Sequence, residues 1–229
     1  MVWARFLKPL PRPSEVPFRR FDVVALDIVS GFPTTKTGFD VIVVFTDRLT
    51  KRVYSEPCTK TVSARDLALI FFRTVFRSQA MPRVLLSDNS PQFTSEFWTE
   101  FFSLLQTDIR LTSSYHPQSN GQTERFNRTL IEALRSFVNA RHDNWDQFLV
   151  HFEFAYNSTV NASTGFSPFI LQFAQAPRAP WDSVLEGGEN NSNGPLSGGD
   201  LAFSLGFDTW KNLKQARASI EDVSASRRT

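Results

Sequence analysis

Two apolar, β-branched segments near the start of the chain most constrain its fold. Phe21–Val29 reads FDVVALDIV and Phe39–Thr46 reads FDVIVVFT. Continuous apolar runs of this length are typical of strands that are buried on both faces. Gly31-Phe32-Pro33 predicts a turn after the first strand, and Asp47–Lys51 predicts a connection to a short third strand at Arg52–Glu56. The sequence therefore predicts an antiparallel meander.

Helical and strand patterns alternate after this meander. Apolar residues recur at helical spacing in several segments, and two short apolar segments lie between them. The expected helices cover 61–77, 95–105, about twenty residues from 122, 144–156 and 167–173, and the expected strands cover 83–87 and 108–112. This order predicts an α/β fold with one mixed sheet and helices on its faces.

Composition divides the chain into a folded region and flanking segments. Four prolines predict an extended arm at the start, and a Gly- and Asn-rich run at 187–194 has no core-forming residues, which is typical of a linker. The expected segments are an extended Pro-rich arm at 1–17, a folded core at 18–178, a flexible linker at 179–199, a possible C-terminal helix at 200–223 and a disordered tail at 224–229.

Cysteine and charge content exclude several classes of function. The 229 residues include one cysteine, Cys58, and three histidines, so neither an internal disulfide nor a zinc site of two Cys and two His is possible within them. The formal net charge of +2 is too mild to predict nucleic-acid binding by itself. No apolar run reaches 18 residues, so we expect neither a membrane span nor a membrane partner.

Three carboxylates have positions that either a structural role or a metal-binding role would explain. Asp27 lies inside an apolar strand, Asp88 directly follows a strand, and Glu124 follows the polar loop Tyr115–Gln122 at the expected start of a helix. A backbone-bonded strand residue, an Asx turn and a helix cap would account for them one by one. Together, at the strand ends and helix start of one sheet edge, they suit Mg²⁺ or Mn²⁺. Thirty-five residues separate Asp88 from Glu124.

The helix after Glu124 has two distinct faces. At ~100° per residue, Asn127, Arg128 and Arg135 fall near Glu124, and the apolar residues fall on the opposite face, at Phe126, Leu130, Leu134 and Phe137. One interpretation is a solvated face with a Glu124–Arg128 ion pair. The other is a metal ligand beside cations that bind phosphates of nucleic acid without reading bases.

Five motifs carry a resemblance to a known family. They are Leu26-Asp27-Ile28, Val44–Lys51 (VFTDRLTK), Leu86-Ser87-Asp88, Pro91–Ser95 (PQFTS) and Tyr115–Arg125 (YHPQSNGQTER). With these motifs, residues 18–178 resemble the catalytic core of retroviral-type integrases, above all those of gypsy-class long-terminal-repeat retrotransposons. The resemblance implies an RNase H-like fold with a five-stranded mixed sheet. It also implies that Asp27, Asp88 and Glu124 are the catalytic, metal-binding D,D(35)E triad.

The resemblance further implies a reaction and its participants. Two Mg²⁺ or Mn²⁺ ions on the triad would support DNA 3′-end processing and strand transfer, which together integrate DNA. The implied partners are the ends of the element, target DNA and further copies of the chain, as a dimer or a larger homo-oligomer, in the nucleus. The implied DNA contacts are Gln118, Asn120, Asn127, Arg128 and Arg135. Asp47 occupies a family-typical position at which we expect a structural turn residue.

Two residues depart from the family pattern, and neither the N-terminal nor the C-terminal module of complete integrases is recognised in this sequence. The family usually has Gly where this chain has Ser90 and Ala80, so we expect backbone strain at both positions. The zinc-binding N-terminal domain of complete integrases is not found, and we expect an isolated, truncated core. The alternative function is therefore a catalytically weak or inactive, domesticated or degenerate integrase-like protein that binds DNA or a protein.

Overall fold

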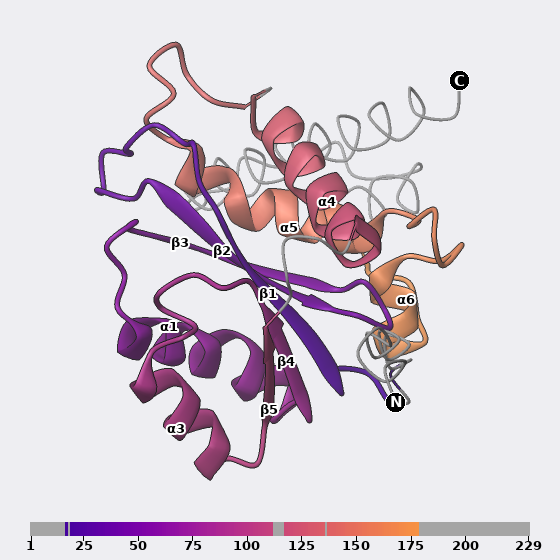
Figure 1. Cartoon of the computed structure of the whole chain (residues 1–229). Coiled ribbons are helices and arrows are strands. Elements are labelled where there is room, and N and C mark those ends of the chain that lie inside the picture. Colours follow the sequence, from indigo (N-terminus) through magenta and orange to yellow (C-terminus); the bar gives the residue numbers. More distant parts are fainter. Residues whose placement is uncertain (1–16, 18, 112–116, 136, 179–229) are drawn as a thin grey trace, which may run out of the picture.

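One five-stranded sheet with helices on both faces forms the folded region (Figure 1). The structure is a computed structural model that describes residues 17, 19–111, 117–135 and 137–178, with the backbone alone for 117–125. Its strands are β1 (Val23–Val29), β2 (Val41–Asp47), β3 (Val53–Cys58), β4 (Val84–Ser87) and β5 (Asp108–Leu111). Its helices are α1 (Ala64–Phe71), η2 (Phe72–Phe76), α2 (Arg77–Gln79), α3 (Glu96–Leu104), α4 (Pro117–Arg135), η3 (Trp145–Phe148), α5 (Leu149–Ser158) and α6 (Pro168–Phe173).

The sheet is mixed, as the element order predicts. Its strand order is β3-β2-β1-β4-β5. The first three strands are antiparallel neighbours and form the expected meander, whereas β1, β4 and β5 are parallel to one another. The three parallel strands therefore place their carboxyl ends at the same edge of the sheet.

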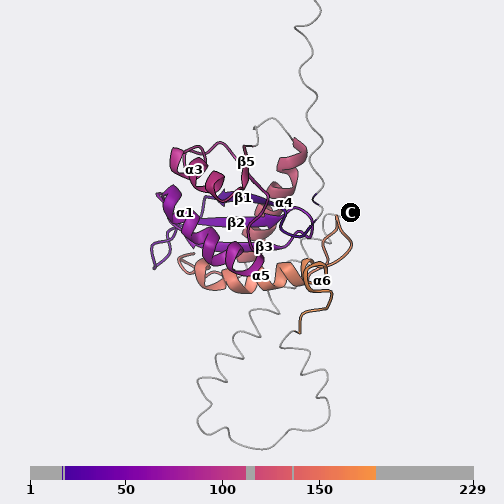
Figure 2. The ribbon, with the colours of Figure 1, turned by 90° about the horizontal axis from the view of Figure 1, so that it is seen from below.

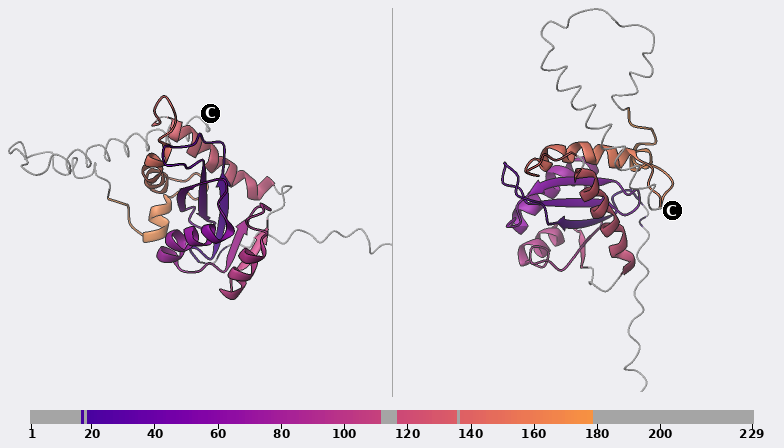
Figure 3. Two further views of the ribbon diagram at one scale, coloured as in Figure 1. Left: turned by 90° about the vertical axis from the view of Figure 1, so that its left-hand side faces the viewer. Right: turned by 90° about the horizontal axis from the view of Figure 1, so that it is seen from above.

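Side-chain alternation along the central strands separates two apolar cores. Val41, Val43 and Phe45 of β2 belong to the core beneath α1 and α3, and Ile42 and Val44 belong to the core beneath α4 and α5. Both faces of the strand are buried, which explains its continuous apolar sequence. Figures 1 and 3 show α1 and α3 on one side of the sheet and α4 and α5 on the other.

Helix α5 covers the outer edge of β3 (Figure 2). Its Asn157 side chain accepts a hydrogen bond from the Val53 N–H at 2.9 Å and donates one to the Val53 carbonyl at 2.8 Å. One turn earlier, Glu153 accepts hydrogen bonds from the N–H and the hydroxyl of Ser55. The next residue on this edge is Pro57, which has no N–H to satisfy. These side chains protect an edge that would otherwise pair with another strand.

Several element boundaries differ from the expected ones. Strand β3 continues through Pro57 to Cys58 instead of ending at Glu56, because an edge strand tolerates a proline whose missing N–H would face outward. The expected helix at 61–77 is observed as α1, η2 and α2 in succession, and η2 is a π-helix. The Pro-rich arm (1–17) apart from Pro17, the linker (179–199), the possible helix (200–223) and the tail (224–229) lie outside the described residues.

Helices that would cross a membrane are not found in the part of the chain that the structure describes, because none is both long and apolar enough.

Candidate active site

Strand β1 presents Asp27 to the face of the sheet that α4 covers. Its neighbours Leu26 and Ile28 pack into the opposite core, beneath α1 and α3. On the α4 side, the Asn127 amide donates a hydrogen bond to Asp27 Oδ2 at 2.9 Å. Asp27 is therefore a half-buried carboxylate with a specific partner from another element, and a purely strand-internal role does not account for it.

The surroundings of Asp27 work against its negative charge. Burial is the largest cause of a raised Asp27 pKa, and the charge of Asp88 raises it further. The hydrogen bonds from Asn127 and from the Ile28 backbone lower the pKa and offset part of this effect. Two carboxylates that repel each other in a partly desolvated place are an arrangement that a nearby cation would stabilise.

Asp88 lies immediately after β4, the parallel neighbour of β1. The pairing register joins Val23 to Val84 and Ala25 to Leu86, and its continuation brings Asp27 level with Asp88. The Asp88 side chain is exposed and accepts a hydrogen bond from the Ser90 N–H at 3.0 Å. The turn role that the sequence indicates for Asp88 is thus observed, and it coexists with the proximity to Asp27.

Helix α4 begins five residues earlier than expected. It starts at Pro117 rather than at Gln122, so the predicted loop Tyr115–Gln122 is helical from Pro117 onward. Proline suits the first helical position because its missing N–H would have no intrahelical partner there. Glu124 is therefore about two turns into the helix, and the interpretation as a helix cap or a dipole partner is wrong.

The helical spacing places Glu124 on the side of α4 that carries Asn127. Asn127 follows it by three residues, which is about one turn along the same face of the helix, and Asn127 contacts Asp27. The side chain of Glu124, like those of Gln118 and Asn120, lies outside the described part of the structure. In the described side chains, no group of three or more His, Cys, Asp or Glu converges on a common point.

The apolar face of α4 holds the helix in this position. Phe126, Leu130 and Leu134 are buried, as their helical spacing predicts, and Phe137 packs against the same core. The ring of Phe126 meets that of Tyr156 edge to face, with centroids 4.9 Å apart. This packing against α5 sets the depth of Asn127 relative to β1.

The opposite face of α4 carries cations. Arg128 and Arg135 are exposed, and Arg128 Nε lies 2.7 Å from Glu132 Oε1, one turn along the helix. The described partner of Arg128 is thus Glu132, and the Glu124–Arg128 pair that the sequence suggested involves a side chain outside the described ones. Sequence reasoning also assigned Asn127 to DNA and missed its bond to Asp27, because a contact between residues 100 positions apart has no local signal.

Asp47 is a structural residue, as expected. Its side chain is fully buried and accepts hydrogen bonds from the N–H groups of Phe21 and Thr50, both at 3.0 Å, and from the Thr50 hydroxyl at 2.6 Å. These bonds close the turn between β2 and β3 and attach the start of β1 to it. These bonds account for Asp47 as a structural residue.

The donor set at this edge fits a hard divalent cation. Asp27 and Asp88 supply carboxylate oxygens, which Mg²⁺ prefers. Asn127 Oδ1 is also buried and has no hydrogen-bond partner among the described residues. A buried oxygen that lacks a donor, beside two carboxylates that repel each other, is better satisfied with a cation and its waters than without them.

Comparison with known proteins agrees with this description. No protein-family model matches the chain. The Transposon Tf2-3 and Tf2-4 polyproteins of Schizosaccharomyces pombe are each 29% identical to it over 171 residues, which are 75% of this chain and 12% of each polyprotein. The chain thus spans about an eighth of the length of these relatives.

Two solved integrase structures have a similar fold. The HTLV-2 integrase catalytic core domain in complex with magnesium, in a trimeric form, matches with a TM-score of 0.50 and 17% identity over 65% of this chain and 94% of that one. A simian T-cell lymphotropic virus intasome bound to the PP2A regulatory subunit B56 gamma matches with a TM-score of 0.54 and 17% identity over 77% of this chain and 59% of that one. The chain therefore resembles transposon polyproteins in sequence and integrase catalytic cores in fold. The RNase H-like fold of an integrase core, with its five-stranded mixed sheet, is confirmed.

Proposed function

We propose that this integrase-like core is a polynucleotidyl transferase that uses Mg²⁺ or Mn²⁺ for DNA 3′-end processing and strand transfer. The observation that carries the proposal is the meeting of Asp27 and Asp88 at the carboxyl edge of the sheet, with Asn127 of α4 bonded to Asp27. In α/β sheets, ligand sites gather at this edge. The relation to transposon polyproteins and the integrase-core fold support DNA as the substrate.

Asp27, Asp88 and Glu124 are the residues that would hold two divalent cations. When bound, such cations supply Lewis-acid activation of the attacking oxygen and neutralise charge on the leaving oxygen. Asn127 orients the Asp27 carboxylate through its amide and lowers the cost of keeping that group ionised. The packed apolar face of α4 holds Asn127 and the Glu124 backbone in a fixed position relative to β1. Phosphoryl transfer depends on such accurate positioning.

The cationic face of α4 is proposed to bind the DNA backbone. Arg128 and Arg135 are exposed on it, and an exposed ion pair such as Arg128–Glu132 contributes little to stability because water and salt screen it. A phosphate can therefore replace Glu132 at little cost. Gln118 and Asn120 lie on the first turns of the same helix and are proposed to approach the DNA end. DNA, further copies of the chain and a nuclear location belong to the same proposal.

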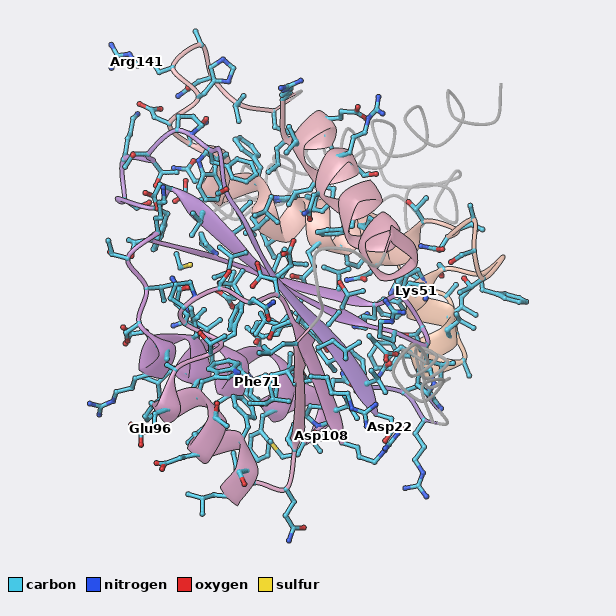
Figure 4. The ribbon with its side chains drawn as sticks, in the orientation of Figure 1. Asp22, Lys51, Phe71, Glu96, Asp108 and Arg141 are labelled. Carbon is cyan, nitrogen blue, oxygen red and sulfur yellow. The ribbon has the colours of Figure 1, made fainter. Side chains whose placement is uncertain are left out.

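A disintegration assay tests the chemistry. The purified protein is incubated with branched DNA and Mn²⁺, and we expect resolution of the branch by strand transfer. Asp88→Asn and Glu124→Gln should each abolish the reaction. The matched control is Asp108→Asn, because Asp108 begins β5 and lies near Asp22 at the opposite, amino edge of the sheet (Figure 4).

The outcomes of this assay separate catalysis from binding. Activity that is lost in the two triad variants and kept in Asp108→Asn would support the proposal. Wild-type product no greater than that of Asp88→Asn would contradict it and leave the alternative of a non-catalytic protein that binds DNA or a protein partner.

A further inference from the structure

An apolar surface of four phenylalanines joins η2 to α3 on the face of the protein away from α4. Phe76 contacts Phe72 at 4.8 Å between ring centroids, Phe72 contacts Phe101 at 5.7 Å, and Phe101 stacks on Phe97 at 5.6 Å. We call these four residues the phenylalanine ladder. Phe76 and Phe97 are 41% and 43% exposed, and Leu104, which continues the row along α3, is 84% exposed. Large apolar side chains gathered on one face mark an interaction surface.

The described part of the chain ends close to this surface. Helix α6 ends at Phe173, and the side chain of the preceding Gln172 donates a hydrogen bond of 2.6 Å to the side chain of Gln79 at the end of α2. Gln79 follows Phe76 by three residues, which is about one helical turn. The end of α6 therefore lies beside the η2 end of the ladder, and Arg178 is only six residues further along the chain than Gln172.

The expected linker at 179–199 is long enough to bring the expected C-terminal helix at 200–223 onto the ladder. Its 21 residues span up to ~70 Å when fully extended, and a flexible chain of this length has an average end-to-end distance of ~25 Å. A tether of this kind gives the segment an effective concentration in roughly the millimolar range. Even a weak contact between the segment and the ladder would therefore persist.

The segment combines apolar and basic residues on one expected face. At ~100° per residue, Phe207, Trp210 and Leu213 fall within an arc of ~120° of a helix. Lys214 and Arg217 fall within the same arc over the following turn. The first half of this face thus offers large apolar side chains, and the second half offers cations.

Helix α3 carries the complementary features in the reverse order. Its acidic residues Glu96 and Glu100 are exposed within its first five residues, and Leu104 is its last residue (Figure 4). A helix that lies antiparallel to α3 would therefore place its apolar half against Phe101 and Leu104. The same helix would place its cations against the two glutamates, and opposite charges at defined positions fix the orientation of a contact.

We propose that the segment 200–223 docks as a helix, antiparallel to α3, onto the phenylalanine ladder of its own chain. The apolar half of the segment removes the ladder from solvent, and the basic half pairs with the acidic start of α3. The chain then supplies the occupant of its own apolar surface. A protein partner that uses the ladder must first displace this segment.

Limited digestion of the full chain with trypsin tests the docking. Trypsin cleaves after Lys211, Lys214 and Arg217, and its rate follows the fraction of molecules in which the segment is undocked. Leu104→Asp should raise this rate about tenfold or more, and the exposure of Leu104 means that its substitution does not threaten folding. The matched control is Val150→Asp on α5, which is 68% exposed and should be cleaved like the wild type. Equal rates in the wild type and Leu104→Asp, or an equal rise in Val150→Asp, would overturn the proposal.

A disulfide crosslink separates docking within one chain from docking between two chains. Leu104→Cys combined with Phe207→Cys should oxidise to a crosslinked monomer. Burial raises the pKa of the Cys58 thiol to about 11, so this thiol does not compete. The control pairs Phe207→Cys with Val150→Cys. A crosslink that joins two chains, or one that forms no faster than in the control, would contradict docking within the chain.

A charge exchange tests the antiparallel orientation. Glu100→Lys and Lys214→Glu should each speed cleavage after Lys211 and Arg217, because each places like charges opposite one another. The double variant should recover the protection of the wild type. A double variant that is cleaved faster than either single variant would contradict this orientation. These readouts are independent of DNA chemistry.

Discussion

Glu153 should make the stability of the fold depend on pH near neutrality. This half-buried carboxyl group of α5 bonds the N–H and the hydroxyl of Ser55 at 2.8 and 2.9 Å. Burial is the main cause that raises the pKa of Glu153 from 4.5 to about 7, and the charge of Glu56 adds to it. The bonds from Ser55 and the charge of Arg52 act in the opposite direction.

The sign and size of the effect follow from this pKa. Below pH 4.5 the group is protonated in both the folded and the unfolded chain, and the stability cost is absent. Between pH 4.5 and 7 the unfolded chain releases the proton first, so the free energy of unfolding falls as the pH rises. Above pH 7 the cost is complete, and the shift from 4.5 to about 7 corresponds to about 3 kcal/mol.

Urea unfolding of the wild type and of Glu153→Gln from pH 4 to pH 8 measures the difference. Glutamine keeps an oxygen for the Ser55 N–H and does not titrate in this range. The variant should therefore gain stability relative to the wild type as the pH rises, by about 3 kcal/mol in total. The control for the substitution itself is Glu96→Gln, on the exposed first turn of α3. A constant difference for Glu153→Gln would refute the reasoning.

Two further predictions concern backbone strain at Ala80 and metal binding near Asn127. Ala80→Gly should raise the free energy of unfolding by about 1 kcal/mol, because Ala80 has φ 69° and ψ −166°, a region that essentially only glycine occupies. The same exchange at Ala68, in the interior of α1, should lower it by at least ~0.5–1 kcal/mol, and thermal denaturation that shows both variants destabilised would contradict this account. Asn127→Ala should raise the Mn²⁺ concentration for half-maximal strand transfer about tenfold, since an outer ligand partner is lost. An unchanged Mn²⁺ titration would show that Asn127 does not position Asp27.

The sequence predicted the elements correctly where the local apolar pattern matches the burial of the side chains in the fold. The apolar runs of β1 and β2 predicted the meander, and the spacing of Phe126, Leu130 and Leu134 predicted the buried face of α4. The strain expected at Ala80 is observed as a positive φ angle, whereas Ser90 is not among the described residues with positive φ. Replacement of a family glycine therefore causes strain only where the backbone still has the positive φ angle that glycine favours, as at Ala80.

Other features depend on tertiary context that a single segment does not contain. Asn120-Gly121 is a turn pair by local rules, yet α4 runs through it, because Pro117 suits a helix start and the rest of the helix packs on the sheet. Pro57 ends a strand by the same local rules, yet β3 includes it because its outward edge needs no N–H. The partner of Asn127 and the environment of Glu153 follow from contacts across about 100 residues, which local patterns do not record.

A metal-specificity assay tests most directly the central claim that Asp88 is a metal ligand in DNA strand transfer. Mg²⁺ is a hard cation that takes oxygen ligands, and Mn²⁺ accepts a thiolate more readily. Asp88→Cys should therefore lose strand transfer with Mg²⁺ and regain it with Mn²⁺, while Asp108→Cys should remain active with both metals. An Asp88→Cys variant that keeps full activity with Mg²⁺, or that Mn²⁺ does not rescue, would contradict the assignment of Asp88 as a ligand.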